Sequence, residues 1–297
     1  MEPCLKVEHE CAACILSRGA AEAKEATANP ALRFRAMCDL LRMLNKEFRP
    51  TSVPADLGTK RDRLIRQLTG NPDPYKRSKR TSNEKALKLL PYARKIVEEG
   101  YTQEDRFKRA CLVAMVGNLI EFDIPGHKAS FSSLRKSFRE ASKDLVVNDL
   151  NKAFELVKKA NTVLYLTDNA GEIVFDTLLV EQLKNMGLNV IVAVKGGPVI
   201  NDATLEDAEA SGIAKIADRV ITTGTDAVGF AAKEVSKEFL DAYKSVDFII
   251  AKGMGYAETL TEYRLKSPHL LLLRTKCEPV ANYFAVGREK NVAKLMP

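Results

Sequence analysis

The sequence is poor in several residue types that would point to a particular class of protein. It has no tryptophan, three histidines and six scattered cysteines in 297 residues, too few cysteines for a disulfide framework. No apolar run approaches the roughly 18 residues that a membrane-spanning helix needs, and the N-terminus lacks a signal-peptide pattern. We therefore expect a cytoplasmic protein with no membrane segment, and a chain long enough for one or two domains.

Several catalytic and nucleotide-binding motifs are also missing. There is no G-x-G-x-x-G and no G-x-x-x-x-G-K-[ST], so neither dinucleotide binding nor a P-loop is predicted. None of the histidines (His9, His127 and His269) lies near a G-x-S-x-G, which argues against a hydrolase triad. An aspartyl-phosphate enzyme would carry a second aspartate two residues after Asp168, where this sequence has Ala170.

The charge is mildly basic and unevenly distributed. The formal net charge is +7. Residues 1–155 carry 29 Lys and Arg against 21 Asp and Glu, whereas the remainder carries 17 against 18. The excess is concentrated at residues 60–63 and 75–80. Such a basic region suits phosphorylated ligands or nucleic acid, and an ordinary solvated surface would look the same.

The first half of the chain has the apolar spacing of helices. Between residues 8 and 155 apolar side chains recur every three or four residues, as in 31–48 and 83–100, and this pattern predicts an all-helical region. The stretch 50–82 is rich in Pro, Gly, Asn and basic residues, and we expect it to mix loop with short helix.

The second half alternates short β-rich runs with helical ones. Five buried strands are predicted at 162–167, 189–194, 218–223, 247–252 and 269–275. Helical runs separate them, at 173–187, 203–212, 229–246 and 256–265. Near-continuous apolar strands alternating with helices predict a doubly wound α/β domain with a mainly parallel sheet of about five or more strands. The expected division is a helical domain at 1–155 and an α/β domain at 156–297.

Polar residues collect directly after the predicted strands, where ligands bind in sheets of this kind. Asp168, Asn169 and Glu172 follow the first strand, Asp202 follows the second, and Lys252 ends the fourth. The carboxylates and the amide offer oxygen ligands only, which suit Mg²⁺ or Mn²⁺ better than a thiolate-bound zinc.

The same edge has features of a phosphate site. Lys252 can supply a positive charge to phosphate, and Gly171 opens a helix whose first N–H groups can face an anion. Metal, lysine and helix N-terminus together predict phosphoryl chemistry. Each element also has a simpler explanation: Asp168 or Asp202 as a helix cap, Lys252 as a strand end reaching water, and glycine as a turn residue.

The sequence resembles the damage-control phosphatases, most closely their archaeal and bacterial subfamily. The resemblance covers nearly the whole chain. It rests on six stretches: ECAACIL (10–16), GNLIEFD (117–123), TDNAGEIVFD (167–176), KGGPVINDAT (195–204), AKGMGY (251–256) and KCEPVA (276–281). It implies a helical N-terminal region packed on an α/β domain, with a divalent-metal phosphatase site between them.

The resemblance also implies roles for individual residues. Asp168, Asn169 and Asp202 match the family's metal-binding positions, and Asp168 is therefore a catalytic candidate. Lys252 matches the lysine that contacts substrate phosphate, and Glu172 completes the motif as the residue that could orient the attacking water. Asn169 is a candidate for substrate contact as well.

Further expectations follow from the same resemblance. Asn118 would reach the site from the helical region, or it could be an amide bonded within a helix pair. Glu121 stands where the motif commonly has Asp, so no role is assigned to it. The implied substrates are small phosphorylated metabolites, including sugar phosphates and damaged or side-product esters, and the implied cofactor is a divalent ion: Mg²⁺, Mn²⁺, Co²⁺ or Ni²⁺. A carboxyl methyltransferase activity proposed for a eukaryotic relative has no support here, because no Gly-rich adenosylmethionine loop is present.

The cysteine pair Cys11/Cys14 allows more than one interpretation. It could be part of a metal site completed by Cys4 and His9, a redox pair, or two structural residues at a helix start. The resemblance implies that both meet Cys277 in space.

Three functions are therefore compared. The leading hypothesis is a metal-dependent phosphatase of small phosphate esters. The second is a nucleic-acid or nucleotide-binding protein that uses the basic half, although few aromatic residues apart from Tyr75 accompany its basic cluster. The third is a sugar-phosphate sensor without catalysis.

Overall fold

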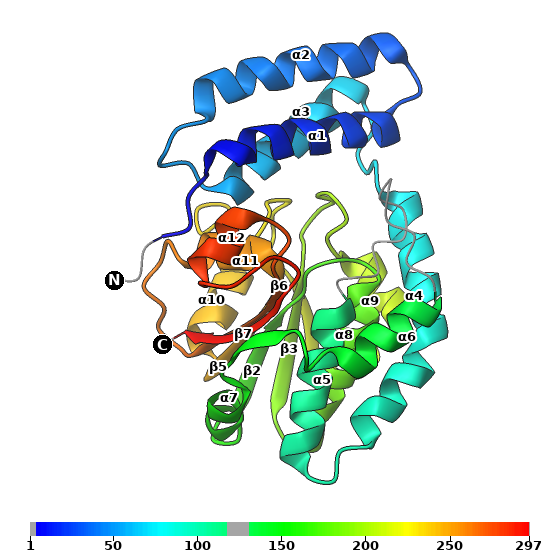
Figure 1. Ribbon diagram of the computed structural model, residues 1–297, viewed down its shortest axis with the longest axis vertical. Coiled ribbons are helices and arrows are strands. Elements are labelled where there is room, and N and C mark those ends of the chain that lie inside the picture. The colour runs from blue at the N-terminus through cyan, green and yellow to red at the C-terminus, as the bar shows by residue number, and fades with distance from the viewer. Residues whose placement is uncertain (1–3, 118–130, 297) are drawn as a thin grey trace.

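The computed structural model describes residues 4–117 and 131–296 (Figure 1). Its first three helices, α1 (His9–Ala26), α2 (Pro30–Glu47) and α3 (Pro54–Thr69), lie together at one end of the molecule (Figure 1). They share a small core of their own, which includes Ile15 and Leu40. Within the predicted helical stretch 31–48, Leu40 and Leu44 are buried, whereas Leu41 is exposed.

The stretch 50–82 is more regular than we predicted. It contains all of α3 and the start of α4 (Lys76–Glu98), with only a short connection between them. Pro54 occupies the first turn of α3, where the missing N–H is harmless, so this proline starts a helix instead of breaking one. The basic residues, which suggested loop, form ion pairs such as that between Lys79 Nζ and Asp73 Oδ2 at 2.9 Å.

The centre of the molecule is a seven-stranded sheet in the order β1-β7-β6-β5-β2-β3-β4. Its strands are β1 (Leu145–Asn148), β2 (Thr162–Leu166), β3 (Asn189–Val194), β4 (Arg219–Thr222), β5 (Phe248–Lys252), β6 (His269–Arg274) and β7 (Asn291–Met296). The five strands β2 to β6 are parallel to one another. β7 is antiparallel to β6 and parallel to β1.

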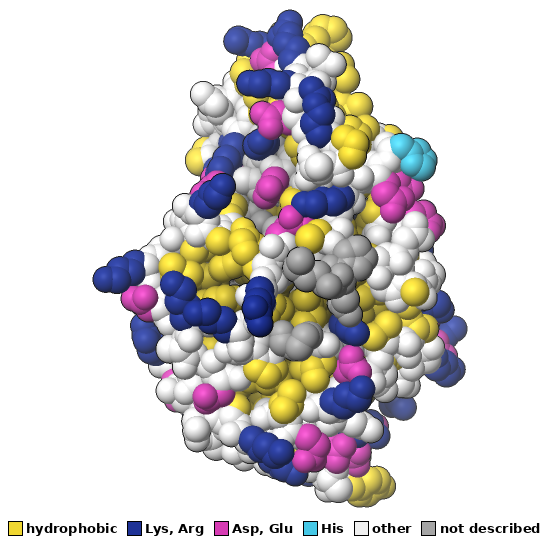
Figure 2. Space-filling view, turned by 90° about the vertical axis from the view of Figure 1, so that its left-hand side faces the viewer, with side chains coloured by type: hydrophobic (Ala, Val, Ile, Leu, Met, Phe, Trp, Pro, Cys, Tyr) yellow, Lys and Arg dark blue, Asp and Glu magenta, His cyan; other side chains and the backbone are white. Residues whose placement is uncertain are grey.

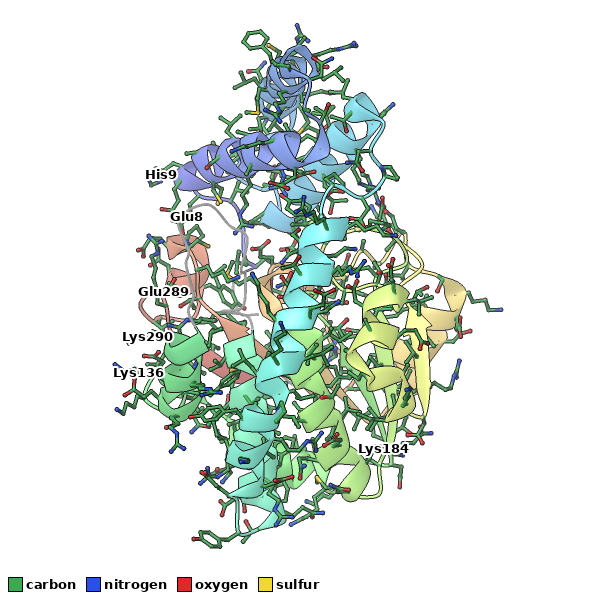
Figure 3. All side chains as sticks on the ribbon, turned by 90° about the vertical axis from the view of Figure 1, so that its right-hand side faces the viewer. Glu8, His9, Lys136, Lys184, Glu289 and Lys290 are labelled. Atoms are coloured by element: carbon green, nitrogen blue, oxygen red, sulfur yellow. The ribbon has the colours of Figure 1, made fainter. Side chains whose placement is uncertain are left out.

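Helices cover both faces of the sheet. One face packs against α4, α5 (Gln103–Gly117), α6 (Phe131–Glu140), α7 (Leu150–Val157), α8 (Glu172–Asn185) and α9 (Leu205–Ser211). The other packs against α10 (Lys237–Ser245), α11 (Gly253–Leu260) and α12 (Glu278–Tyr283). A 3₁₀ turn at Ile213–Lys215 follows α9 on the first face. Along β2, Tyr165 faces the first layer and Leu164 the second, as the alternation of a strand requires. Figure 3, which views the α4 side, shows this helix running along the molecule beneath α3.

The predicted fold class is confirmed, and all five predicted strands are present. Two strands were missed: β1, at one edge of the sheet, and its neighbour β7. β1 is short and its residues alternate between half-buried and exposed, while Lys294 interrupts the apolar pattern of β7, so neither resembles a buried strand.

Since β1 precedes residue 155, the first half of the chain also contributes to the sheet. The division into domains at that residue stays a prediction. Within the described ranges, none of the helices combines the length and apolarity needed to span a membrane.

Candidate active site

A cavity of about 210 Å³ lies between the N-terminal helices and the carboxyl ends of the sheet strands. α1 and α3 form one wall, and residues that follow the strands β2 to β6 form the other. Asp168, Asn169 and Asp202 all line it. The predicted gathering of polar residues at this edge of the sheet is therefore present in the structure.

The loops that carry these three side chains are joined by backbone hydrogen bonds. Asn169 and Asp202 form an isolated antiparallel bridge. Ala203 N donates to Asp168 O at 2.8 Å, and Ala170 N donates to Asn201 O at 2.9 Å. Two segments more than thirty residues apart in the chain thus form one rigid unit.

Burial and like charge dominate the electrostatics of this unit. Desolvation, reinforced by the charges of Glu172 and Asp202, raises the pKa of Asp168 well above its usual range. Desolvation also raises the pKa of Asp202 to about 6, although Lys195 acts in the opposite direction, with its Nζ 3.6 Å from Asp202 Oδ2. Two buried carboxylates that repel each other favour a cation between them.

The donor set fits a hard divalent cation. Within the described ranges, no three His, Cys, Asp or Glu side chains converge as a complete set of ligands. Here two carboxylates, Asp168 and Asp202, come with one amide, Asn169, and such oxygen donors suit Mg²⁺ or Mn²⁺ completed by water. The hydroxyl of Tyr256 supports this fit. It is buried with no hydrogen-bond partner among the described residues, and both aspartates act electrostatically on it.

Glu172 and Lys252 belong to a buried network beside this unit. Lys252 Nζ donates to Glu172 Oε1 at 2.5 Å, to Asp176 Oδ1 at 2.7 Å and to Ala114 O at 3.0 Å. Tyr165 Oη also donates to Asp176 Oδ1, at 2.7 Å. Burial raises the pKa of Asp176 to about 6, despite the opposing effect of Lys252. The other oxygen of Glu172 lies 3.5 Å from Asn169 Nδ2, so this network adjoins the candidate metal ligands.

Lys252 and Gly171, the two predicted phosphate contacts, are both bonded to other parts of the protein. Lys252 is fully buried, and its three acceptors are all supplied by the protein. The Gly171 amide donates to Asn83 Oδ1 at 2.6 Å, and a β-carbon on Gly171 would lie 2.9 Å from Ser82 Cβ. Residues of α4 therefore pack directly against the N-terminus of α8. The phosphate-binding roles of both residues stay predictions.

The cavity is also lined by charged residues to which the sequence analysis gave no role. Arg18 from α1, Lys276 after β6 and Glu258 from α11 all line it. Burial raises the pKa of Glu258 to about 7, while Arg18 lowers it. Arg18 lies in α1, whose apolar spacing is that of an ordinary amphipathic helix. Its place in the cavity therefore depends on how α1 packs over the sheet. Lys276 follows a predicted strand and opens the KCEPVA stretch (276–281), so its place at this edge of the sheet was predictable.

The three cysteines Cys11, Cys14 and Cys277 line the same cavity. All are free thiols, and Cys11 Sγ accepts a hydrogen bond from Glu8 N at the start of α1. Burial raises the pKa of Cys11, and it raises that of Cys277 to about 11, so neither is activated as a thiolate. The capping contact gives Cys11 a structural role, and a metal or redox role stays a prediction. Asn118 and Glu121 lie outside the described residues.

Comparison with known proteins assigns this arrangement to a family. The family description "Damage-control phosphatase ARMT1-like domain" matches residues 7–292. The chain belongs to the damage-control phosphatase family. A damage-control phosphatase of Archaeoglobus fulgidus is 37% identical over 293 residues, which cover 98% of this chain and 100% of the relative. A damage-control phosphatase of Pyrococcus horikoshii is 36% identical over 286 residues, with 96% of each chain covered.

A solved structure agrees with this assignment. The crystal structure of a DUF89 family protein from Pyrococcus horikoshii matches with a TM-score of 0.86 and 35% sequence identity, covering 97% of this chain and 98% of that one. The resemblance drawn from the six motifs is therefore confirmed. Membership in the damage-control phosphatase family supports a phosphatase role for this chain.

Proposed function

We propose that this chain is a metal-dependent phosphatase that hydrolyses small phosphate esters, such as sugar phosphates or side-product phosphometabolites. One observation carries the proposal: the bridge between Asn169 and Asp202 brings two loop segments together, so that Asp168, Asn169 and Asp202 share one wall of a cavity. Family membership supports the phosphatase part, and the chemistry of these donors supports the metal.

In this proposal, Asp168, Asn169 and Asp202 hold a divalent cation, Mg²⁺, Mn²⁺, Co²⁺ or Ni²⁺. The cation supplies positive charge that polarises the phosphoryl group and stabilises the charge that develops on its oxygens. The chain must then hold the ester in place, because phosphoryl transfer is catalysed mainly by positioning and charge neutralisation.

Glu172 is the proposed group that orients the attacking water. Its Oε2 lies on the side of Asn169, while Lys252 holds Oε1 at 2.5 Å. Lys252 thereby fixes the orientation of the carboxylate. A phosphate contact from Lys252 itself would require Nζ to exchange one of its three acceptors for a phosphoryl oxygen.

The size of the cavity favours a small metabolite. Its volume of about 210 Å³ lies below the several hundred cubic ångströms typical of sites for drug-sized ligands. Arg18 and Lys276, which also line the cavity, are candidates to bind the rest of an anionic substrate. A polymer would have to pass α1 and α3 to reach Asp168.

The pairing of the basic residues argues against a nucleic-acid interface. In the clusters at 60–63 and 75–80, the basic side chains largely form ion pairs with neighbouring acids: Lys60–Glu47, Arg61–Glu22, Arg63–Asp226, Lys76–Glu206, Lys79–Asp73 and Arg80–Glu84. On the face shown in Figure 2, Lys and Arg side chains are interspersed with Asp and Glu, and they do not form a continuous stripe. A phosphate backbone is bound by unpaired cations along a track.

The test is phosphate release from p-nitrophenyl phosphate and from a panel of hexose and pentose phosphates, with each of the four metals. We expect turnover with at least one metal, its loss on chelation, and recovery when the metal is added back. Asp168→Asn and Asp202→Asn should each lose nearly all activity while remaining folded. If metal-loaded wild-type protein releases no phosphate from the whole panel, the proposal is wrong.

The alternatives give different results in the same preparation. A sensor would bind a hexose phosphate in calorimetry without releasing phosphate. A nucleic-acid-binding protein would shift RNA or DNA in a gel at low salt and lose the shift steeply as salt rises.

A further inference from the structure

The turn that presents Asp202 has an unusual backbone. Asp202 N donates to Val199 O at 3.0 Å, which closes a tight turn over residues 199–202. Inside this turn Ile200 has a φ of 47°. A β-branched residue rarely adopts the left-handed region, so the surrounding structure must hold it there. Such strain next to a candidate metal ligand raises the question of what maintains it.

Asp62, from the middle of α3, holds the turn. Its side chain is fully buried, and Oδ1 accepts a hydrogen bond from Ile200 N at 2.9 Å. Its other oxygen, Oδ2, accepts from Arg66 Nε at 2.6 Å, and the same guanidinium pairs with Asp226 in the loop after β4. The carboxylate of Asp62 is thus fixed from both sides, and it is the partner of the strained amide.

The alternative explanation is an ordinary ion pair between Asp62 and Arg66, one turn apart on α3. Two contacts around Asp62 and Arg66 are not explained by that ion pair alone. Arg66 already has a second partner in Asp226, whereas the amide of Ile200 finds its acceptor on a different segment of the chain.

We propose that Asp62 is a positioning residue for Asp202: it accepts the Ile200 amide, holds the strained 199–202 turn, and so makes the metal site depend on the docking of α3. This inference rests on the proposed function, because it assumes that Asp202 binds a cation. α3 also lines the cavity, through Ala55 and Gly58. One helix therefore shapes the substrate wall and supports a metal ligand on the opposite wall.

The test is the affinity of the full-length protein for Mn²⁺, measured by titration calorimetry, with the melting temperature recorded for every variant. We expect Asp62→Ala to weaken Mn²⁺ binding by about 10- to 100-fold, the usual effect of losing a group that orients a metal ligand. Asp226→Asn is the matched control. It loosens the attachment of α3 through Arg66 and Arg63 without touching the Ile200 amide, and it should change the affinity less than threefold.

A second substitution tests the cause. Glycine adopts positive φ without strain, so Ile200→Gly should restore much of the Mn²⁺ affinity in the Asp62→Ala background. This coupling between positions 62 and 200, measured as a double-mutant cycle, is not expected of a residue that only stabilises α3.

Hydrogen exchange on the wild type keeps the inference testable if Asp62→Ala fails to fold. The Ile200 amide should exchange as slowly as the buried amides of β2. Three results would each overturn the inference. They are fast exchange at the Ile200 amide, a Mn²⁺ affinity of Asp62→Ala equal to that of the wild type, and a loss of Mn²⁺ affinity in Asp226→Asn equal to the loss in Asp62→Ala. Failure of the wild type to bind any divalent cation would instead overturn the proposed function beneath it, so the two failures are distinguishable.

Discussion

Gly253 lies against the carboxylate of Asp168, and no side chain fits between them. A β-carbon at position 253 would lie 2.8 Å from Asp168 Oδ1 and closer still to Oδ2. Gly253 also has a φ of +83°, which favours glycine. The first residue of α11 therefore helps to fix where Asp168 points.

We expect Gly253→Ala to displace Asp168 and to lower kcat/KM for phosphate release roughly 100-fold, as a shift of about 1 Å in a catalytic group can. The assay is steady-state hydrolysis of p-nitrophenyl phosphate with saturating metal. Gly187→Ala is the matched control, because Gly187 has a φ of +84° but, among the described residues, no atom within 4 Å of an added β-carbon. It introduces the same backbone strain without the clash. Equal activity losses in the two variants would show that strain, and not the position of Asp168, is responsible.

Lys252 provides a second prediction, because its structural role is visible without substrate. Removing it leaves Glu172 and Asp176 as buried carboxylates without their cation. Lys252→Met should therefore lower the free energy of unfolding by about 3–5 kcal/mol, measured by urea denaturation without metal or substrate. A residue that contacted only substrate phosphate would leave the stability of the free protein unchanged.

The control for this experiment is Lys184→Met. Lys184 pairs with Asp218 near the end of α8 away from Glu172 (Figure 3), and 30% of its side-chain surface is exposed. A pair at the surface contributes about 1 kcal/mol or less. If the two variants lose similar stability, the buried network does not have the importance that we assign to it.

Tyr256 gives a third prediction, because its hydroxyl is buried near Asp168 and Asp202 without a partner among the described residues. Tyr256→Phe should hardly change the stability of the metal-free protein, since no internal hydrogen bond is lost. It should weaken Mn²⁺ binding about tenfold if the hydroxyl orders water around the cation. Calorimetric titration and thermal unfolding measure the two effects.

Tyr243→Phe should show the reverse pattern. The Tyr243 hydroxyl has a protein partner, His269 Nε2 at 2.7 Å, on the face of the sheet that packs against α10 to α12. Its loss should lower stability and leave metal affinity unchanged. Unchanged Mn²⁺ binding in Tyr256→Phe would contradict the prediction for Tyr256.

These residues differ in how far the sequence alone could identify them. Asp168, Asn169 and Asp202 follow predicted strands, and parallel strands bring their carboxyl ends to one edge, so their proximity was predictable. β2 and β3 are also neighbours in the sheet, which allows the bridge between Asn169 and Asp202.

Asp176 was missed although a signal for it exists. It is a carboxylate inside the apolar run of α8, a position that requires a buried cationic partner, and Lys252 is that partner. Asp62 and Arg18 had no such signal. Their places depend on how α1 and α3 pack over the sheet, which the spacing of apolar residues within each helix does not determine.

His269 gives the last prediction, a dependence of stability on pH. Its ring is buried at the start of β6, with its nitrogens 2.7 Å from the Tyr243 hydroxyl and from Ser267 O. Burial lowers the pKa of His269 from 6.5 to about 4, although the Ser267 carbonyl acts in the opposite direction. Below pH 6.5 the unfolded chain therefore binds a proton that the folded protein excludes, and stability falls as the pH drops from 6.5 through 4.

His269→Gln removes this titration. The wild type should be more stable than the variant at pH 7, because the glutamine disturbs the contact with Tyr243, and the difference should shrink by up to roughly 3 kcal/mol as the pH falls to 4. Urea unfolding of both proteins at half-unit steps of pH measures this. Other buried acids also titrate in this range. The raised pKa of Glu258, for example, makes stability fall as the pH rises from 4.5 to 7. These acids are present in both proteins, so their effects cancel in the difference. A difference in unfolding free energy that stays constant across this range would mean that folding does not lower the pKa of His269.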